Sequence, residues 1–271
     1  MSNIFYRAAL AAAFSFHTLT AYAQELANGI AFYEKGDFAA AIIELRPLAE
    51  QGDGTARYHI GAMYIMGNGV IKDAHEAARW FHLAAIQGNV WAQVMLGTLY
   101  SSGEGVSEDH VEAERWYRLA AEQGNASAQF NLANMYRKGE GVLKDMTEAE
   151  RWYRLSAEQG QVNAQAWLGS RYYSAENATI DAAEAAHWFR LAAEQGNGDT
   201  QFLLARMYVR GEGVIKDVVS AHMWYNIAGA NGVSHAGTVR DNLEAKMLPE
   251  QIASAVQRAR TCMSSNYDQC D

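Results

Sequence analysis

The sequence predicts an all-α fold, a right-handed superhelical solenoid in which α/α hairpins repeat every 36 residues. The first observation is a glycine that recurs at this interval from Gly52 to Gly232. The second is that tryptophan, tyrosine and aspartate keep the same interval, starting at Trp80, Tyr64 and Asp73. Four residue types in one register indicate a tandem repeat. We place its five copies within 53–232, at 53–88, 89–124, 125–160, 161–196 and 197–232.

The third observation is the helical pattern inside one copy. In residues 89–124, Ala92, Leu96 and Tyr100 are spaced by four and share one face of a first helix. A Gly-x-Gly turn at 103–105 ends that helix, because glycine adopts the left-handed conformation common at helix C-termini. The fourth copy has Ala-Glu-Asn in this place, at 175–177, so we expect a different turn there.

A second helix follows the turn. Asp109 and Glu112 are expected to form a reciprocal capping box at its start. The predicted core face joins small and large side chains, namely Ala113, Trp116, Tyr117, Ala120 and Ala121. Glu114, Arg118 and Glu122 are spaced by four on the other side and predict a solvated convex surface.

The N-terminus has the pattern of a secretory signal over residues 1–23. Arg7 supplies the positive charge, residues 8–20 are mostly apolar, and Ala21 and Ala23 form a small-x-small cleavage site. The apolar stretch is shorter than the roughly 20 residues that span a bilayer. An uncleaved N-terminal helix is the alternative. We expect no transmembrane segment in the rest of the chain.

The two ends of the array depart from the repeat. Residues 24–52 are predicted to be a degenerate helical pair that caps the N-terminus, and 233–271 to hold C-terminal capping helices at about 233–247 and 249–263. Cys262 and Cys270 are expected to pair in an oxidising compartment. Two free thiols or an intermolecular link are the alternatives.

Composition excludes several classes of function. Acidic residues outnumber basic ones 31 to 22, a formal charge of −9, which argues against binding nucleic acid. The Gly-x-Gly turns never extend to a phosphate-binding Gly-x-Gly-x-x-Gly, and the eight histidines lack metal-ligand spacing. We therefore predict no catalytic residues, no cofactor, no metal and no enzymatic activity.

Two segments, AQFNLANMYRKGEGVLKD (128–145) and AERWYRLAAEQGN (113–125), resemble the Sel-one-like repeat (SLR) family, relatives of the tetratricopeptide repeats. The resemblance covers the five repeats closely and the two ends loosely. It implies stacked α/α hairpins that serve as an interaction scaffold. It also implies that the first helix of each hairpin lines the concave side.

The predicted partner-binding stripe lies on these first helices, opposite the core face. Its positions vary from copy to copy, so the fold does not dictate them. The stripe combines aromatic and arginine anchors with amides that suit a peptide main chain. Its candidate residues are His59, Trp91, Met95, Asn131, Asn134, Asn163, Trp167, Arg206 and Arg210. The alternative is that Trp91, Met95 and Trp167 pack against neighbouring repeats.

The sequence thus predicts an exported scaffold that binds a protein or peptide in its concave groove. We expect it in the periplasm of a Gram-negative bacterium, or secreted. Other readings are a regulator of envelope signalling or exopolysaccharide output, and a secreted effector that binds host protein. A cell-wall or β-lactam hydrolase has no residues in its favour.

Overall fold

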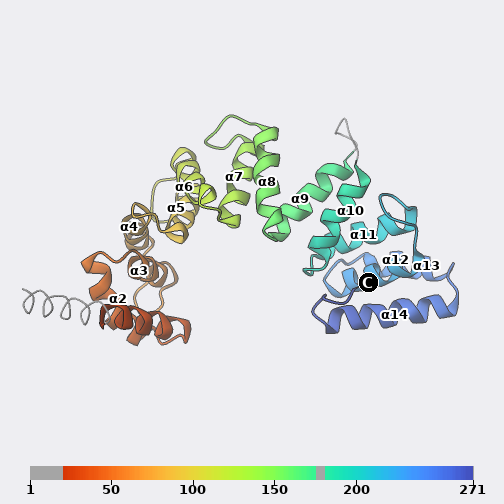
Figure 1. Ribbon diagram of the computed structural model, residues 1–271, viewed down its shortest axis with the longest axis horizontal. Helices are drawn as coiled ribbons and strands as arrows, with labels where there is room; N and C mark the ends of the chain where they lie inside the picture. The colour runs from red at the N-terminus through yellow and green to blue at the C-terminus, as the bar shows by residue number, and fades with distance from the viewer. Residues whose placement is uncertain (1–20, 175–180, 271) are drawn as a thin grey trace, which may run out of the picture. The chain divides into compact units, whose positions relative to one another are not determined.

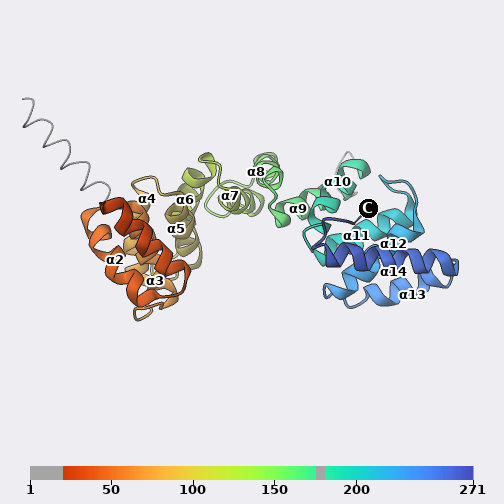
Figure 2. The same cartoon turned by 60° about the horizontal axis from the view of Figure 1, so that its bottom comes forward.

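A computed structural model describes residues 21–174 and 181–270, and all regular secondary structure within these ranges is helical (Figures 1 and 2). Residues 21–34 form a helix. The later helices are α2 (Phe38–Gln51), α3 (Gly54–Met66), α4 (Ala74–Ala85), α5 (Val90–Ser102), α6 (His110–Glu122), α7 (Ala126–Lys138), α8 (Met146–Glu158), α9 (Val162–Tyr173), α10 (Ala182–Ala193), α11 (Gly198–Arg210), α12 (Val218–Ala230), α13 (Ala236–Glu244) and α14 (Pro249–Ser264).

The chain divides into two compact units. The first ends at Ala128 and also takes in Lys138–Lys144, and the second comprises Gln129–Arg137 and the chain from Asp145 onward. Within each unit, helices pack mainly on their neighbours in sequence, such as α4 on α3 and α5, or α10 on α9 and α11. This consecutive pairing confirms an all-α solenoid of helical hairpins.

Some predicted features lie outside the described residues. These are most of the signal sequence, residues 1–20, and the altered turn at 175–177. The helix at 21–34 continues through the predicted cleavage site, and the Tyr22 hydroxyl donates a hydrogen bond to Asp53 (2.9 Å). Ile30 and Tyr33 pack on the core that α2 and α3 share.

Glycines set the turn between the two helices of a hairpin. Gly103 ends α5 in the left-handed region, at φ 71°. Gly105 is needed for a different reason, because a Cβ there would lie 2.3 Å from the backbone of Ala74 at the start of α4. A Cβ on Gly213 would likewise lie 1.9 Å from the carbonyl oxygen of Ala182. The second glycine of each motif thus lets a turn touch the preceding hairpin.

The aspartate caps are confirmed, but the reciprocal half of the capping box is wrong. Asp109 accepts hydrogen bonds from the backbone of Val111 and Glu112 (2.9 and 3.1 Å). Its own N–H donates to the Tyr100 carbonyl (2.9 Å), and the Glu112 carboxylate pairs with Arg115 (3.4 Å). The Tyr100 carbonyl therefore accepts the hydrogen bond from the Asp109 N–H that the Glu112 side chain would accept in a capping box.

The repeated tryptophans lie in the core, as predicted. Trp152 is 4% exposed, and the equivalent residues 80, 116, 188 and 224 are buried as well. The guanidinium of Arg151 lies 4.0 Å from the indole centroid of Trp152, within the range of a cation–π contact. On the predicted convex surface, Glu114 is only 14% exposed and pairs with Arg118, so that surface is partly covered.

A buried glutamine joins consecutive hairpins, and we call this contact the glutamine bridge. Gln165, 3% exposed, donates from Nε2 to the carbonyl of Ala157 at the end of α8 (3.1 Å). Its Oε1 accepts a hydrogen bond from Gln195, which follows α10 (2.8 Å). Equivalent pairs of bonds involve Gln93 with Ala85 and Gln123, and Gln201 with Ala193 and Asn231. Each bridge adds a second hydrogen bond to a carbonyl at the end of a helix, since Ala157, for example, also accepts from the N–H of Gly160 (2.9 Å).

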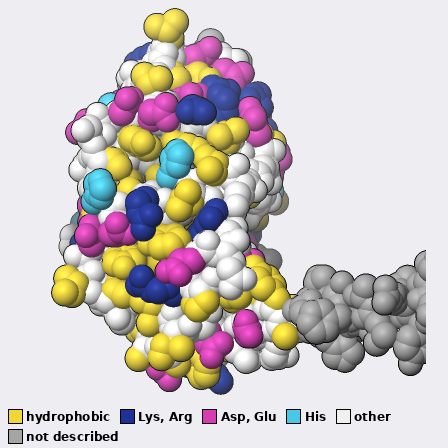
Figure 3. Space-filling view, turned by 90° about the vertical axis from the view of Figure 1, so that its left-hand side faces the viewer, with side chains coloured by type: hydrophobic (Ala, Val, Ile, Leu, Met, Phe, Trp, Pro, Cys, Tyr) yellow, Lys and Arg dark blue, Asp and Glu magenta, His cyan; other side chains and the backbone are white. Residues whose placement is uncertain are grey.

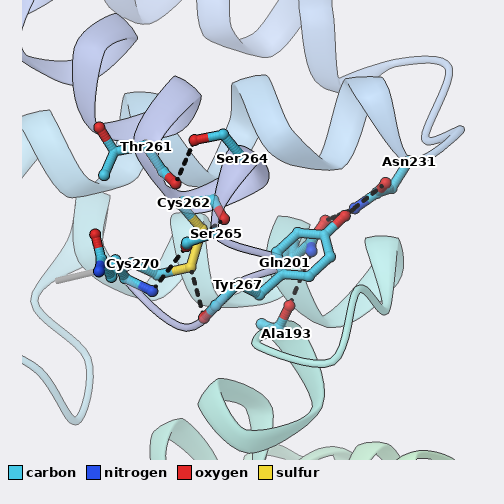
Figure 4. Close-up of a disulfide and its surroundings, with 10 residues drawn as sticks. Ala193, Gln201, Asn231, Thr261, Cys262, Ser264, Ser265, Tyr267 and Cys270 are labelled. Atoms are coloured by element: carbon cyan, nitrogen blue, oxygen red, sulfur yellow. Dashed lines mark hydrogen bonds between the residues drawn. A yellow bond between two sulfur atoms is a disulfide. The ribbon is translucent and has the colours of Figure 1, made fainter.

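Two helices follow the last repeat, α13 at 236–244, shorter than the expected 233–247, and α14 at 249–264 with Pro249 in its first turn. Cys262 and Cys270 form a disulfide, which confirms the expected pairing (Figure 4). Within the loop that it closes, the Tyr267 hydroxyl exchanges hydrogen bonds with the side chain of Asn231 (2.9 and 3.1 Å). The disulfide loop therefore reaches the last glutamine bridge.

The glutamine bridge predicts a specific loss of stability. Replacing Gln165 with Leu removes two hydrogen bonds, one to the Ala157 carbonyl and one from Gln195, which should cost about 1–3 kcal/mol of unfolding free energy. Urea denaturation followed by circular dichroism measures this loss. A Gln257→Leu variant, changed on the exposed surface of α14, should stay within about 0.5 kcal/mol of wild type. Equal midpoints for the two variants would show that the bridge adds no stability.

Candidate interaction surface

In the first unit, the predicted stripe residues differ in exposure. Trp91, in the first turn of α5, is 58% exposed. Met95, one turn later, is partly buried and packs against the core cluster that holds Phe81 and Trp116. The packing alternative thus describes Met95, whereas Trp91 presents its indole to solvent. On the face seen in Figure 3, hydrophobic side chains are mixed with charges of both signs.

His59 is half-buried on α3, and aromatic rings surround it. Its ring centroid lies 4.8 Å from that of Tyr33 and 5.2 Å from that of Tyr58. Burial lowers the pKa of His59, and the carboxylates of Glu34 and Asp53 oppose that effect. Its Nδ1 is buried with no hydrogen-bond partner among the residues described. His59 is therefore packed against Tyr33 of the helix at 21–34.

In the second unit, the buried Tyr153 of α8 brings several side chains together. The Trp167 indole stacks on its ring, with centroids 4.0 Å apart and planes at 20°. Its hydroxyl donates to Asn134 Oδ1 (2.7 Å) and accepts from Arg137 Nε (3.1 Å). Burial raises the pKa of Tyr153, while Arg137 opposes the shift. The packing alternative therefore also describes Trp167, which is half-buried between repeats.

The amides of the stripe are not equivalent. Asn134 Oδ1 also accepts from Arg137 (3.2 Å), and its Nδ2 donates to the Phe130 carbonyl (3.1 Å). Its hydrogen-bonding capacity is thus largely used within the protein, contrary to its predicted role toward a peptide. Asn131 is half-buried, and Asn163 in the first turn of α9 is exposed.

Arg206 and Arg210 lie one turn apart on α11. The Arg206 guanidinium lies 5.3 Å from the ring centroid of Tyr173, at the end of α9. The Tyr173 hydroxyl donates to Glu212, which also pairs with Arg210 (3.6 Å). Burial, together with the hydrogen bond to Glu212, raises the pKa of Tyr173. Tyr173, Ala182, Arg210 and Glu212 line an open cavity of about 390 Å³.

The Sel1 repeat family matches residues 54–89, 92–125, 126–161, 162–197 and 198–233. The chain belongs to the Sel1 repeat family. Its Sel1 repeats begin one to three residues after the boundaries drawn from the recurring glycine. A comparison with curated protein sequences gives no match.

Solved structures of Sel1 repeat proteins are similar to this chain, and the first shares its fold. A Sel1 repeat protein from Oxalobacter formigenes is 33% identical, with a TM-score of 0.72, over 87% of this chain and 96% of that chain. A protective antigen present in uropathogenic Escherichia coli strains, displaying an SLR fold, is 24% identical, with a TM-score of 0.47, over 91% of this chain and 78% of that one. A putative Sel1 repeat protein from Klebsiella pneumoniae is 22% identical, with a TM-score of 0.46, over 74% of this chain and 98% of that one.

The family match confirms the resemblance seen in the sequence, and Sel1 repeat proteins are generally non-catalytic scaffolds for protein interaction. Within the described ranges, no helix is long and apolar enough to span a membrane. Nor do the residues there include three or more His, Cys, Asp or Glu side chains grouped to hold a metal ion.

Tyr173 and Glu212 escaped the sequence analysis. Tyr173 occupies a position that holds Ile65, Ser101, Arg137 and Val209 in the other Sel1 repeats, so its variation was visible in the sequence. It falls one residue outside the predicted stripe, because Ser174 is the residue equivalent to Arg210. A wider stripe would have included it.

The packing of His59 predicts a dependence of stability on pH. The pKa of His59 in the folded protein lies below its unfolded value of about 6.5. At pH values between these two, the unfolded chain therefore binds more protons than the folded protein. The stabilising contribution of neutral His59 is full above about pH 6.5 and is lost as the pH falls through the folded pKa. Unfolding free energies from pH 7.5 to 5 should fall less steeply in a His59→Gln variant. A His75→Gln variant, changed at an exposed histidine of α4, should keep the wild-type slope, and identical slopes in all three proteins would contradict the assignment.

Proposed function

We propose that this Sel1 repeat protein is an exported scaffold that binds another protein or peptide through the first helices of its hairpins. The observation that carries the proposal is the exposure of Trp91. An indole that is 58% exposed adds little to the core, and at this position the other repeats have Thr55, Ser127, Asn163 and Asp199. Exposed tryptophans are frequent anchors of protein interfaces.

The second unit supports the same reading with a different chemistry. Its first-helix surface carries the partly exposed Trp167 and the arginines of α11. Trp167 is stacked on Tyr153 and is therefore held rigid, so a partner that covers it loses little side-chain entropy on binding. The two units are proposed as separate contact surfaces for one partner or for two.

Crosslinking from defined positions tests this function. A photo-crosslinking amino acid in place of Trp91 or Asn163 should yield adducts with a protein partner in intact cells. The same residue in place of Ile71, which is 90% exposed in the turn before α4, should not. Trp91→Ala should weaken binding of the crosslinked partner about tenfold or more, without loss of fold, because interface tryptophans often contribute over 1.4 kcal/mol. Adducts of equal yield from residues 71 and 91 would refute the assignment.

We further propose that the protein acts in the periplasm or after secretion. A cysteine pair joined within nine residues is typical of an oxidising compartment, and the first 23 residues have the pattern of a secretory signal.

Export predicts both the mature N-terminus and the thiol state. Protein recovered from the cell envelope should begin at Gln24, and Cys262 and Cys270 should resist alkylation unless a reductant is added. Mass spectrometry after thiol blocking at lysis reports both properties. A protein that begins at Met1 in the cytosolic fraction, with both thiols alkylated, would contradict export.

A further inference from the structure

The first helices of the second unit carry positive charge in an acidic chain. From Gln129 to Arg137, and along α9 and α11, the arginines are Arg137, Arg171, Arg206 and Arg210. Asp199 is the only acidic residue in these same segments, so their net charge is +3. The whole chain has a formal charge of −9. Positive charge is therefore concentrated on the helices that bear the candidate stripe.

The arginines of the second helix α8 are neutralised by carboxylates. Arg151 pairs with Glu148 (3.0 Å), and Arg154 lies near Glu150 and Glu184 (3.8 and 3.4 Å). Arg171, although on α9, faces the same cluster and lies 3.6 Å from Glu150. These residues are fixed by internal ion pairs and leave little charge for a ligand.

Arg137 and Arg206 differ, because neither forms an ion pair with any residue in 21–174 or 181–270. Arg137 is positioned by neutral groups, the Tyr153 hydroxyl and the Asn134 amide. Arg206 lies over the Tyr173 ring, and its Nε is buried without a hydrogen-bond partner in the described part of the chain. Guanidinium groups that are oriented but lack a counter-ion favour binding of an anion.

Arg210 extends this positive surface at the end of α11. Its side chain is 55% exposed, and it shares Glu212 with the Tyr173 hydroxyl. The cavity of about 390 Å³ beside it has room for the carboxylate end of a side chain. In the stripe positions of Arg206 and Arg210, the second repeat carries Thr98 and Ser102, and Lys138 is the one basic residue at these positions in the first four repeats. The repeat fold therefore does not require arginine in either place.

We propose that the first-helix surface of the second unit binds an acidic segment of a protein partner, with Asp or Glu side chains held by Arg137, Arg206 and Arg210. This inference rests on the proposed scaffold function and specifies the chemistry of its partner. Arginine recognises carboxylates through paired N–H donors, and the half-buried Trp167 of α9 supplies an apolar contact for the intervening residues. The arginines favour a short acidic segment. A long polyanion such as a nucleic acid is disfavoured, because it would also meet the excess of carboxylates on the rest of the chain.

The test uses the full mature chain and a fluorescein-labelled dodecapeptide of Glu, Asp, Gly and Tyr, with its Gln and Asn counterpart as reference. Fluorescence anisotropy should show binding of the acidic peptide that weakens with added salt. An Arg206→Gln/Arg210→Gln variant should bind at least tenfold more weakly. The control, Lys246→Gln/Arg260→Gln, makes the same change in net charge at exposed positions outside the stripe and should change the affinity less than twofold.

Several outcomes would overturn the proposal. They are equal affinity for the acidic and amide peptides, equal losses in both double variants, or tighter binding of a single-stranded DNA 12-mer than of the acidic peptide. If the double variant does not fold, Arg210→Gln alone, changed at an exposed residue, should still weaken binding severalfold, and no change there would also refute the assignment. Crosslinks from residue 91 that persist without acidic-peptide binding would reject the charge assignment and leave the scaffold function standing.

Discussion

The glutamine bridge is the contact on which the rest of the structure depends. A helical hairpin of this size cannot bury its apolar face alone, so it is stable only when its neighbour is held in register. The amide of Gln165 fixes that register, because its donor and its acceptor reach the helices on either side of its own. In the first repeat Arg57 takes the same position and donates to the Ala49 carbonyl (2.9 Å), so the bond is kept although the residue differs.

Because the bridge and the tryptophan core fix the framework, chemical variation is confined to the remaining faces. The same residue type then has different uses on the two helices of a hairpin. Arginine on second helices supports the fold, as Arg151 does by covering the Trp152 indole and pairing with Glu148. Arginine at position 206, on a first helix, has no carboxylate partner among the residues described. We attribute the difference to function, since the framework is complete without Arg206.

The sequence predicted the fold far better than the surface. A 36-residue period in four residue types determines the helices, their turns and the buried tryptophans, because each depends on contacts repeated in every copy. Helical phase also gave the direction in which stripe residues point from their own helix. It could not show that Tyr33 covers His59, or that Tyr153 and Arg137 occupy the Asn134 amide, because those groups come from other elements or are used in only one repeat. The failed half of the capping box has the same origin, a carbonyl supplied by the preceding helix.

The C-terminal end shows what a repeat array must do where it stops. Asn231 completes the last glutamine bridge, and the matched Sel1 repeats end at residue 233. Tyr267 meets this need by exchanging hydrogen bonds with Asn231 and by placing its ring over Gly196, where a Cβ would lie 3.3 Å from the ring. Tyr267 adopts φ 70°, a conformation rare for a residue with a bulky side chain, and the Cys262–Cys270 link encloses it in a short loop. One tyrosine of the cap thus bonds the side chain that ends the last glutamine bridge.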